Sequence, residues 1–239
     1  MDRTDTSKVQ KYKNRSQSDE DFRYKPLIDC YRAVCSHDIA TVHDFIDHHI
    51  NPDSLLSNED FKLLKAEYRS LFDSEEQTTP LVPAVLCNDT AIAKLLIASG
   101  ANVNLHTDFK YDAALLCACD TESRGYDGVE MAELLLDAGA DIEIRDEYDN
   151  TPLIEACYSN NVALVKLLVS RGADVHARKY RQETPLTVAT QSASAETARC
   201  LLVHGADIHD CNEDGESVFL LAERNNSPEM VTFLRSYSG

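Results

Sequence analysis

The residues of this chain that could do chemistry gather near its N-terminus. They are two cysteines and four histidines: Cys30, Cys35, His37, His43, His48 and His49. Such residues are the usual ligands of zinc, and a Cys–His pair is the nucleophile and base of a cysteine protease. A structural zinc site needs two close ligand pairs, and two histidines on one helix need a spacing of three or four positions. Here four residues separate the cysteines, and His43 and His48 are five positions apart. The spacing therefore predicts no metal site in this region.

The rest of the chain contains no recognisable catalytic pattern. It has no glycine-rich phosphate loop, no Gly-x-Ser-x-Gly elbow and no His-Glu-x-x-His motif. We therefore predict that the protein is not an enzyme and has neither a catalytic residue nor a cofactor. The alternative from another class is a small enzymatic or metal-binding device in the N-terminal Cys/His region, carried on the rest of the chain.

The composition limits the partners and the compartment. The chain has 239 residues, of which 43% are apolar, and 23 Lys and Arg stand against 41 Asp and Glu, a formal charge of −18. Nucleic acids and anionic membranes are polyanions, so we expect the chain to bind neither. No apolar run reaches the roughly eighteen residues of a membrane helix, and the basic, Ser-rich start lacks the apolar stretch of a secretory signal. We expect an intracellular monomer, cytoplasmic and/or nuclear, with its eight cysteines reduced.

A repeated pattern organises most of the chain. The motif Thr-Pro-Leu-x-x-Ala begins at Thr79, Thr151 and Thr184, and weaker copies begin at Ala113 and Ser217. Each of the first four copies is followed by a Leu-Leu or Leu-Ile pair and then by Gly-Ala-Asp or Gly-Ala-Asn, which starts at Gly100, Gly139, Gly172 and Gly205. The last three motif starts are 33 residues apart, and so are the last three of these glycines. Two independent landmarks with one period indicate a repeated structural unit.

Each landmark has a physical role. Thr before Pro caps a helix, because its hydroxyl accepts a backbone N–H and Pro needs no donor at the first helical position. The small Ala lets neighbouring helices approach closely. A second helix, for example 162–170, is expected to place Val165, Leu167 and Leu168 in the core, and the Gly after it ends the helix in a left-handed conformation.

This pattern resembles the ankyrin repeat. The resemblance covers residues 79–239 and implies an all-α helical solenoid with protruding hairpin fingers. Two features depart from the family pattern. The His that usually follows Thr-Pro-Leu is replaced in every copy, so we expect more apolar packing there. The finger Gly survives only as Gly215, and its position is occupied by Tyr111, Asp149 and Gln182 in the other fingers.

The same landmarks divide the chain into parts. Residues 1–25 are rich in Lys, Arg, Ser and Asp and are predicted to be a disordered tail. Residues 26–54 align with a repeat and form a degenerate N-terminal capping repeat, and residues 55–78 are predicted to be an inserted amphipathic helix. Residues 79–239 then hold five ankyrin-like repeats. The second carries five extra residues between its helices, and the last is a C-terminal cap.

The resemblance implies a function in protein binding, through the finger tips and a concave groove. We predict a non-enzymatic adaptor, scaffold or inhibitor, and a secreted microbial effector using the groove on host proteins remains a further alternative. Tyr and Arg are common interface hot spots, and the tips are rich in both. The candidate partner-binding residues are Phe109, Lys110, Tyr111, Arg145, Tyr148, Tyr158, Arg178, Lys179, Tyr180 and Arg181. Because the cations among them form an island on an acidic body, we expect an acidic or phosphorylated partner segment.

Overall fold

The structure is a computed structural model, and it describes residues 27–48, 51–55, 79–105, 113–122 and 125–237. The predicted N-terminal tail and nearly all of the predicted helix at 55–78 lie outside these ranges. Three of the candidate binding residues, Phe109, Lys110 and Tyr111, lie outside them as well.

The described part of the chain is helical and contains no β-strand. A helix occupies residues 27–35 at its N-terminal end. The elements that follow are α3 (Ile39–Asp47), α5 (Leu81–Leu86), α6 (Thr90–Ala98), α7 (Ala114–Cys119), α8 (Val129–Asp137), α9 (Pro152–Tyr158), α10 (Val162–Ser170), the short 3-10 turn Tyr180–Gln182, α11 (Pro185–Gln191), α12 (Ala195–Val203), α13 (Val218–Arg224) and α14 (Pro228–Tyr237).

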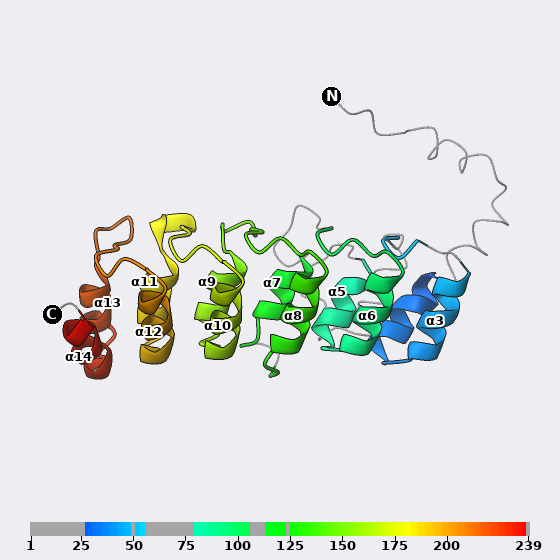
Figure 1. The fold of residues 1–239 in the computed structure, drawn as a ribbon, viewed down its shortest axis with the longest axis horizontal. Coiled ribbons are helices and arrows are strands. Elements are labelled where there is room, and N and C mark those ends of the chain that lie inside the picture. Colours follow the sequence, from blue (N-terminus) through cyan, green and yellow to red (C-terminus); the bar gives the residue numbers. More distant parts are fainter. Residues whose placement is uncertain (1–26, 49–50, 56–78, 106–112, 123–124, 238–239) are drawn as a thin grey trace, which may run out of the picture.

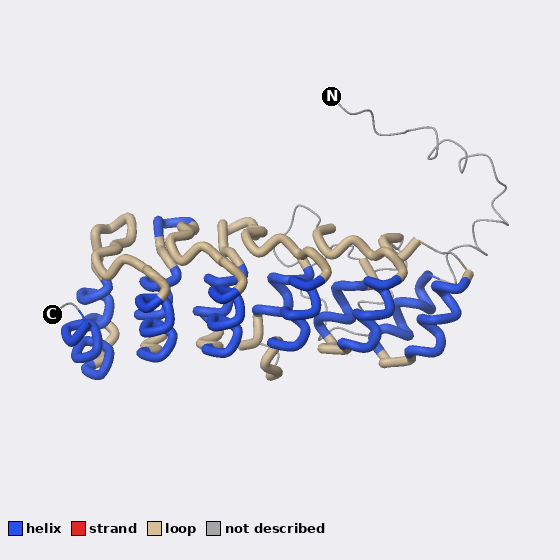
Figure 2. Tube along the Cα trace, viewed as in Figure 1, coloured by secondary structure: helices blue, strands red, loops and turns tan. Residues whose placement is uncertain are grey.

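The helices form pairs that stack in one row (Figure 1). The first helices of successive pairs contact one another in the order α5, α7, α9, α11 and α13, and the second helices do so in the order α3, α6, α8, α10, α12 and α14. Where the structure describes them, the long connections between pairs project from one edge of the row, and the short turns within pairs lie at the other edge (Figure 2). The structure therefore confirms the predicted all-α solenoid with protruding fingers.

The predicted caps form in most copies. Thr151 and Thr184 accept hydrogen bonds from the backbone N–H groups three residues later, with Pro at the first helical position. The motif at Thr79 differs, because Pro80 itself precedes α5 and makes no side-chain cap. The slot of the usual His also varies. Ile154 there is fully buried, as expected for apolar packing, but Thr187 instead makes a reciprocal capping box with Thr184.

One continuous apolar core runs through the stack. The repeated Ala is completely buried in all five copies, at positions 84, 118, 156, 189 and 222, as its role in close helix approach requires. Val165 and Leu168 on α10 are also completely buried, as predicted. Leu167, predicted to be in the core as well, is only half-buried and packs against the edge of the core. The glycines that end the second helices have φ values of 87–98°, in the left-handed region where a side chain would be strained.

The fingers begin with a repeated turn. The Asn or Asp of each Gly-Ala-Asx sequence accepts a hydrogen bond from the backbone N–H two residues later, as in the bond from His176 to Asp174 (2.9 Å). The side chain two positions after this Asn or Asp then reaches the next finger. Asp53, Asn104 and Glu143 each accept the backbone N–H of the next Asn or Asp, at 2.9, 2.7 and 2.8 Å. These bonds fix how far each finger is offset from its neighbour.

The insertion in the second copy is held on both sides. The hydroxyl of Tyr126 donates to the carbonyl of Val85 on the preceding pair at 3.2 Å. The amide of Asn161, the cap of α10, donates to the carbonyl of Asp127 at 2.7 Å. Gly128 joins the insertion to α8 with φ 64°, and a Cβ there would stand 2.2 Å from a backbone oxygen of α7. The described part of the insertion therefore bridges three successive pairs.

Candidate partner-binding surface

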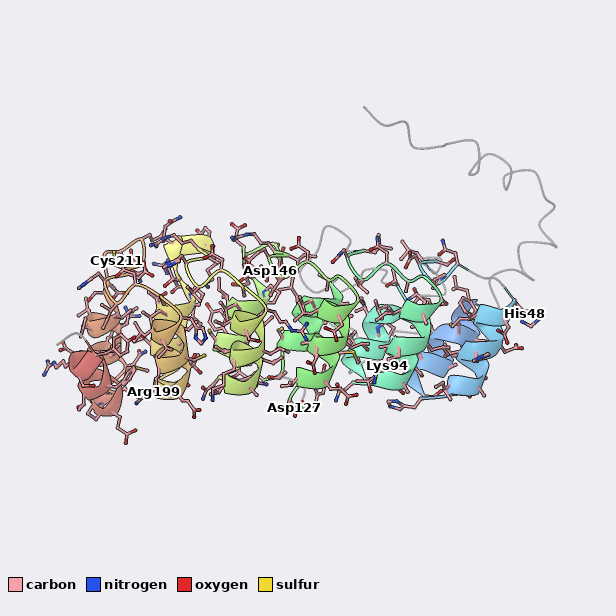
Figure 3. The ribbon with its side chains drawn as sticks, in the orientation of Figure 1. His48, Lys94, Asp127, Asp146, Arg199 and Cys211 are labelled. Atoms are coloured by element: carbon pink, nitrogen blue, oxygen red, sulfur yellow. The ribbon has the colours of Figure 1, made fainter. Side chains whose placement is uncertain are left out.

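Three consecutive fingers present most of the described candidate binding residues. They are segments 143–150, 176–183 and 209–216, which we call the finger row. In Figure 3, Asp146 and Cys211 mark this edge of the molecule, and Asp127 and Arg199 mark the opposite edge. The tips are joined by backbone hydrogen bonds. Tyr180 N–H donates to the carbonyl of Tyr148 at 3.1 Å, and Glu213 N–H donates to the carbonyl of Arg181 at 2.9 Å. The row is thus one connected surface.

Two equivalent arginines, 33 residues apart, tie each finger to the next. The Arg145 guanidinium donates to the carbonyl of Asp149 in its own finger (3.1 Å) and to that of Arg178 in the next (2.9 Å). Arg178 repeats this arrangement with Gln182 (2.9 Å) and with the following finger. It also pairs with Asp210 at 2.7 Å, whose side chain is only 7% exposed. Both arginines therefore stabilise the fingers themselves.

Lys179 also has an internal partner. Its ammonium group lies 2.8 Å from a Glu183 carboxylate oxygen and 4.8 Å from the centre of the Tyr158 ring. Burial disfavours the charged form of Glu183, but hydrogen bonds from Lys179 and Gln191 outweigh it and lower the pKa of this carboxyl. Burial likewise opposes the charge of Lys179, but its hydrogen bonds to Glu183 and Tyr158 raise its pKa. The candidate binding residue Tyr158, at the end of α9, is part of this cluster.

Arg181 stands at a tip with backbone φ 64°. Its guanidinium pairs with Glu213 at 2.7 Å and also with Asp214, both in the next finger. Its hydrogen bond to Glu213 and the charges of both carboxylates raise the pKa of the guanidinium. Arg181 thus keeps its charge, but carboxylates of the same chain already neutralise it.

These contacts change the electrostatic reading of the surface. Arg178, Lys179 and Arg181 each lie within ion-pair distance of at least one carboxylate of the row. The expectation of an acidic or phosphorylated ligand assumed cations without partners, whereas these three are already paired within the chain. What the row does present is aromatic, because Tyr148 is 46% exposed and Tyr180 is 66% exposed.

The candidate binding residues chosen from the sequence include no acidic residue of this surface. Glu147 and Asp149 flank Tyr148, and Asp210 holds Arg178 from a buried position. The repeat period contains a signal that points to the acidic partners of these arginines. Each carboxylate that pairs with Arg178 or Arg181 lies 32 or 33 residues after it, which is one repeat.

The N-terminal Cys/His region is not assembled into a chemical site in the part that the structure describes. His43 lies 3.0 Å from Asp47, and His37 lies 2.7 Å from Asp89 of the next helix pair. Cys30 is buried in the core, and this burial raises the pKa of its thiol to about 12. Among the described residues, no group of three or more His, Cys, Asp or Glu could hold a metal ion. His49 lies outside the described ranges.

No helix in the described ranges is both long enough and apolar enough to span a bilayer. All eight cysteines are free thiols, and seven of them are buried or half-buried.

Comparison with known proteins identifies the family. A family model of ankyrin repeats, which comprises three copies, matches residues 82–179 and 153–239. No curated protein matches the chain. The two matched ranges overlap and together cover the helix pairs that carry the finger row. With this match over most of its length, and with its stack of capped helix pairs, the chain belongs to the ankyrin repeat family.

Proposed function

We propose that the chain is a non-enzymatic adaptor, scaffold or inhibitor that binds a segment of a partner protein along the finger row. Ankyrin repeats are in general protein-interaction modules and are typically not enzymes, and this family membership gives the coarse function. The finer assignment concerns the surface. It is carried by one observation, the exposure of Tyr148 and Tyr180 on adjacent tips that a backbone hydrogen bond joins.

The exposure of these rings is not explained by stability. A tyrosine in solvent contributes little to the core, whereas at an interface it offers a large, rigid contact area for a small loss of side-chain entropy. The contacts beneath the tips also favour binding. Because the arginines and backbone bonds already hold the fingers, a partner meets a surface whose ordering cost is small.

The proposal includes a partner in the cytosol or nucleus. It is supported by eight free thiols, because a reducing compartment keeps thiols in this state.

The test compares one double variant with one control variant in the same binding experiment. Tyr148→Ala combined with Tyr180→Ala is expected to weaken capture of the native partner by tenfold or more, since tyrosine hot spots contribute on the order of 2 kcal/mol. Its unfolding midpoint should stay close to that of the wild type. Tyr237→Ala is the matched control, because this tyrosine is 44% exposed but lies on α14, away from the fingers.

The outcome shows whether the finger row is the surface that binds the partner. A double variant that captures the partner as well as the wild type does would place the binding surface elsewhere. Equal losses in the double variant and in Tyr237→Ala would show that the fingers have no special role.

A further inference from the structure

We propose that Cys35 and Cys87 form a redox-sensitive dithiol site, at which hydrogen peroxide converts the two thiols into one disulfide between adjacent helix pairs. The site lies among the short turns, at the edge of the stack opposite to the fingers (Figure 2). The inference is independent of the proposed function, because it uses no residue of the finger row.

Both cysteines end the first helix of their pair. Cys35 is the last residue of the helix at 27–35, and Cys87 is the C-cap of α5. The two turns that follow are equivalent, because in each the backbone N–H of an Asp cap donates back to the repeated Ala. These bonds end at the carbonyls of Ala33 and Ala84 and measure 2.8 and 2.9 Å. Counted from that Ala, Cys35 is at the second position of its pair and Cys87 is at the third position of the next pair.

Other contacts show that stacking brings these two positions together. At the last junction the same positions are occupied by Gln191 and Asn225, and the Asn225 amide donates to the Gln191 carbonyl at 3.0 Å. At the first junction His37 and Asp89, each two residues after one of the cysteines, have the same offset, and His37 Nδ1 lies 2.7 Å from the Asp89 carboxylate. The two thiols between these pairs of residues form a hydrogen bond with each other.

The two sulfurs differ in their access to solvent. Cys87 is half-buried, whereas Cys35 is buried, with 8% of its surface exposed. The hydrogen bond to Cys87, together with burial, raises the pKa of the Cys35 thiol. Cys35 therefore keeps its proton and donates it towards the sulfur of Cys87. A small oxidant arriving from solvent meets Cys87 first, and Cys35 is the thiol that waits beside it.

The oxidation has two steps. The sulfur of Cys87 attacks one oxygen of the peroxide, so that an S–O bond forms, the O–O bond breaks, and the departing hydroxide leaves as water with the thiol proton. The sulfur of Cys35 then attacks that of Cys87, so that an S–S bond forms, the S–O bond breaks, and a second water leaves with the proton of Cys35. Two thiols thus lose two electrons and two protons to one peroxide.

The surroundings of other cysteines do not favour this reaction. Cys119 and Cys157 are completely buried, and burial raises the pKa of both thiols, so a solvent-borne oxidant does not reach them. Cys211 is exposed, but it lies on the last finger, near the other end of the stack (Figure 3). It therefore serves as the exposed reference thiol.

The disulfide would fasten the first described helix pair to the second. Within a stack each pair contacts only its neighbours, so the pair at an end opens most easily. A bond between positions 35 and 87 restricts the unfolded chain and stabilises this junction. In a reducing compartment the dithiol is the resting state, and disulfides that form there are transient and redox-sensing.

The experiment maps the bond directly. The full chain is reduced, freed of reductant and treated with hydrogen peroxide; remaining thiols are blocked, and the chain is digested with trypsin without reduction. The tryptic peptides 33–62 and 70–94 contain one cysteine each, Cys35 and Cys87. Mass spectrometry should show them as one linked species that dithiothreitol separates, with loss of most of the unlinked forms. The same peroxide treatment in urea should give less of this species, because the fold no longer holds the sulfurs together.

Two variants provide the specific arm. Cys87→Ser should yield no linked species and should leave Cys35 reduced, because its thiol is buried. Cys211→Ser is the matched control, since it also removes one thiol, and it should form the link as the wild type does. In thermal melts, peroxide should raise the unfolding midpoint of the wild type, and dithiothreitol should reverse this shift; neither reagent should move the midpoint of Cys87→Ser.

The results decide on the site and on its role separately. Wild-type peptides that stay unlinked, a link from either cysteine to another thiol, or an equal yield in urea would overturn the dithiol site. A disulfide between Cys35 and Cys87 that leaves the midpoint unchanged would confirm the site and overturn its stabilising role.

Discussion

The two equivalent finger arginines allow a direct test of the buried charge at Asp210. Replacing Arg178 with Met keeps the length of the aliphatic chain but leaves the Asp210 carboxylate, 7% exposed, without its guanidinium. One oxygen of this carboxylate, Oδ2, already has no hydrogen-bond partner in the described structure. Replacing Arg145 with Met removes only hydrogen bonds to two carbonyls. The residue equivalent to Asp210 in the preceding finger is Ala177, which has no charge for Arg145 to compensate.

The expected magnitudes follow from burial. Breaking a fully buried pair costs about 3 to 5 kcal/mol, but Arg178 is 41% exposed, so water can reach the site and we expect about 2 to 3 kcal/mol. Arg145→Met should cost about 1 kcal/mol, because its exposed carbonyl partners can bind water instead. Asp210→Ala should cost less than about 1 kcal/mol. The Arg178→Met, Asp210→Ala double variant should then be less destabilised than Arg178→Met alone, with a coupling of about 1 to 2 kcal/mol.

Urea unfolding followed by far-UV circular dichroism measures these differences, provided that the slope of the transition is the same in all four variants. Two results would refute the reasoning. One is an equal cost for the two arginine substitutions, since Asp210 would then carry no charge that needs Arg178. The other is simple additivity in the double variant, which would mean that the two side chains act independently.

Three further predictions concern stability. Leu168→Ala should lower the free energy of unfolding by about 2 to 5 kcal/mol through a core cavity, and an unchanged urea midpoint would contradict its burial. Gly128→Ala should cost more than Gly172→Ala, because the new Cβ meets a backbone oxygen at 2.2 Å in the first case and open space in the second; thermal melts of the two variants measure the difference. Lys179→Met should lower stability by about 1 to 3 kcal/mol at neutral pH. The lowered pKa of Glu183 means that the pair stabilises the fold above the ordinary pKa of Glu, about 4.3, and that this contribution is lost as the pH falls through the lowered value. The difference from wild type should therefore shrink in urea titrations on the acid side of that range.

The helices could be predicted from the sequence because their determinants are local and repeated. A cap, a small residue and a terminal glycine recur at fixed spacing, and each acts within a few residues of its own position. The left-handed finger position shows where residue identity is a weaker guide. Asp149 and Gln182 occupy the slot that is Gly215 in the last finger, yet all three have positive φ values of 61°, 59° and 74°. The hydrogen bonds that Arg145 and Arg178 donate to the carbonyls of the first two show how the surrounding contacts hold this conformation in residues other than glycine.

The candidate site was less predictable, because its contacts join residues of different repeats. The exposure of Tyr148 and Tyr180 could be expected from their place at the tips. The neutralisation of Arg178 and Arg181 could not, since it depends on which carboxylates lie one period further along and on how the fingers are offset. The segment 176–183 by itself is therefore cationic, whereas the three adjacent fingers together form an acidic surface.

The side-chain bonds between fingers differ from one junction to the next. In three fingers an Asp, Asn or Glu accepts the backbone N–H of its neighbour, but His176 occupies this position before the last finger, and within the described residues it makes no such bond. The last finger is held instead through Arg178, whose partner Asp210 is buried, and through Arg181, whose pair with Glu213 is about half exposed to solvent on both sides. Dissolved ions weaken such pairs far more than they weaken the packing of helices. Local opening should therefore start at the C-terminal pair α13–α14 in concentrated salt, and amide protons there should exchange with deuterium sooner than those of the inner pairs.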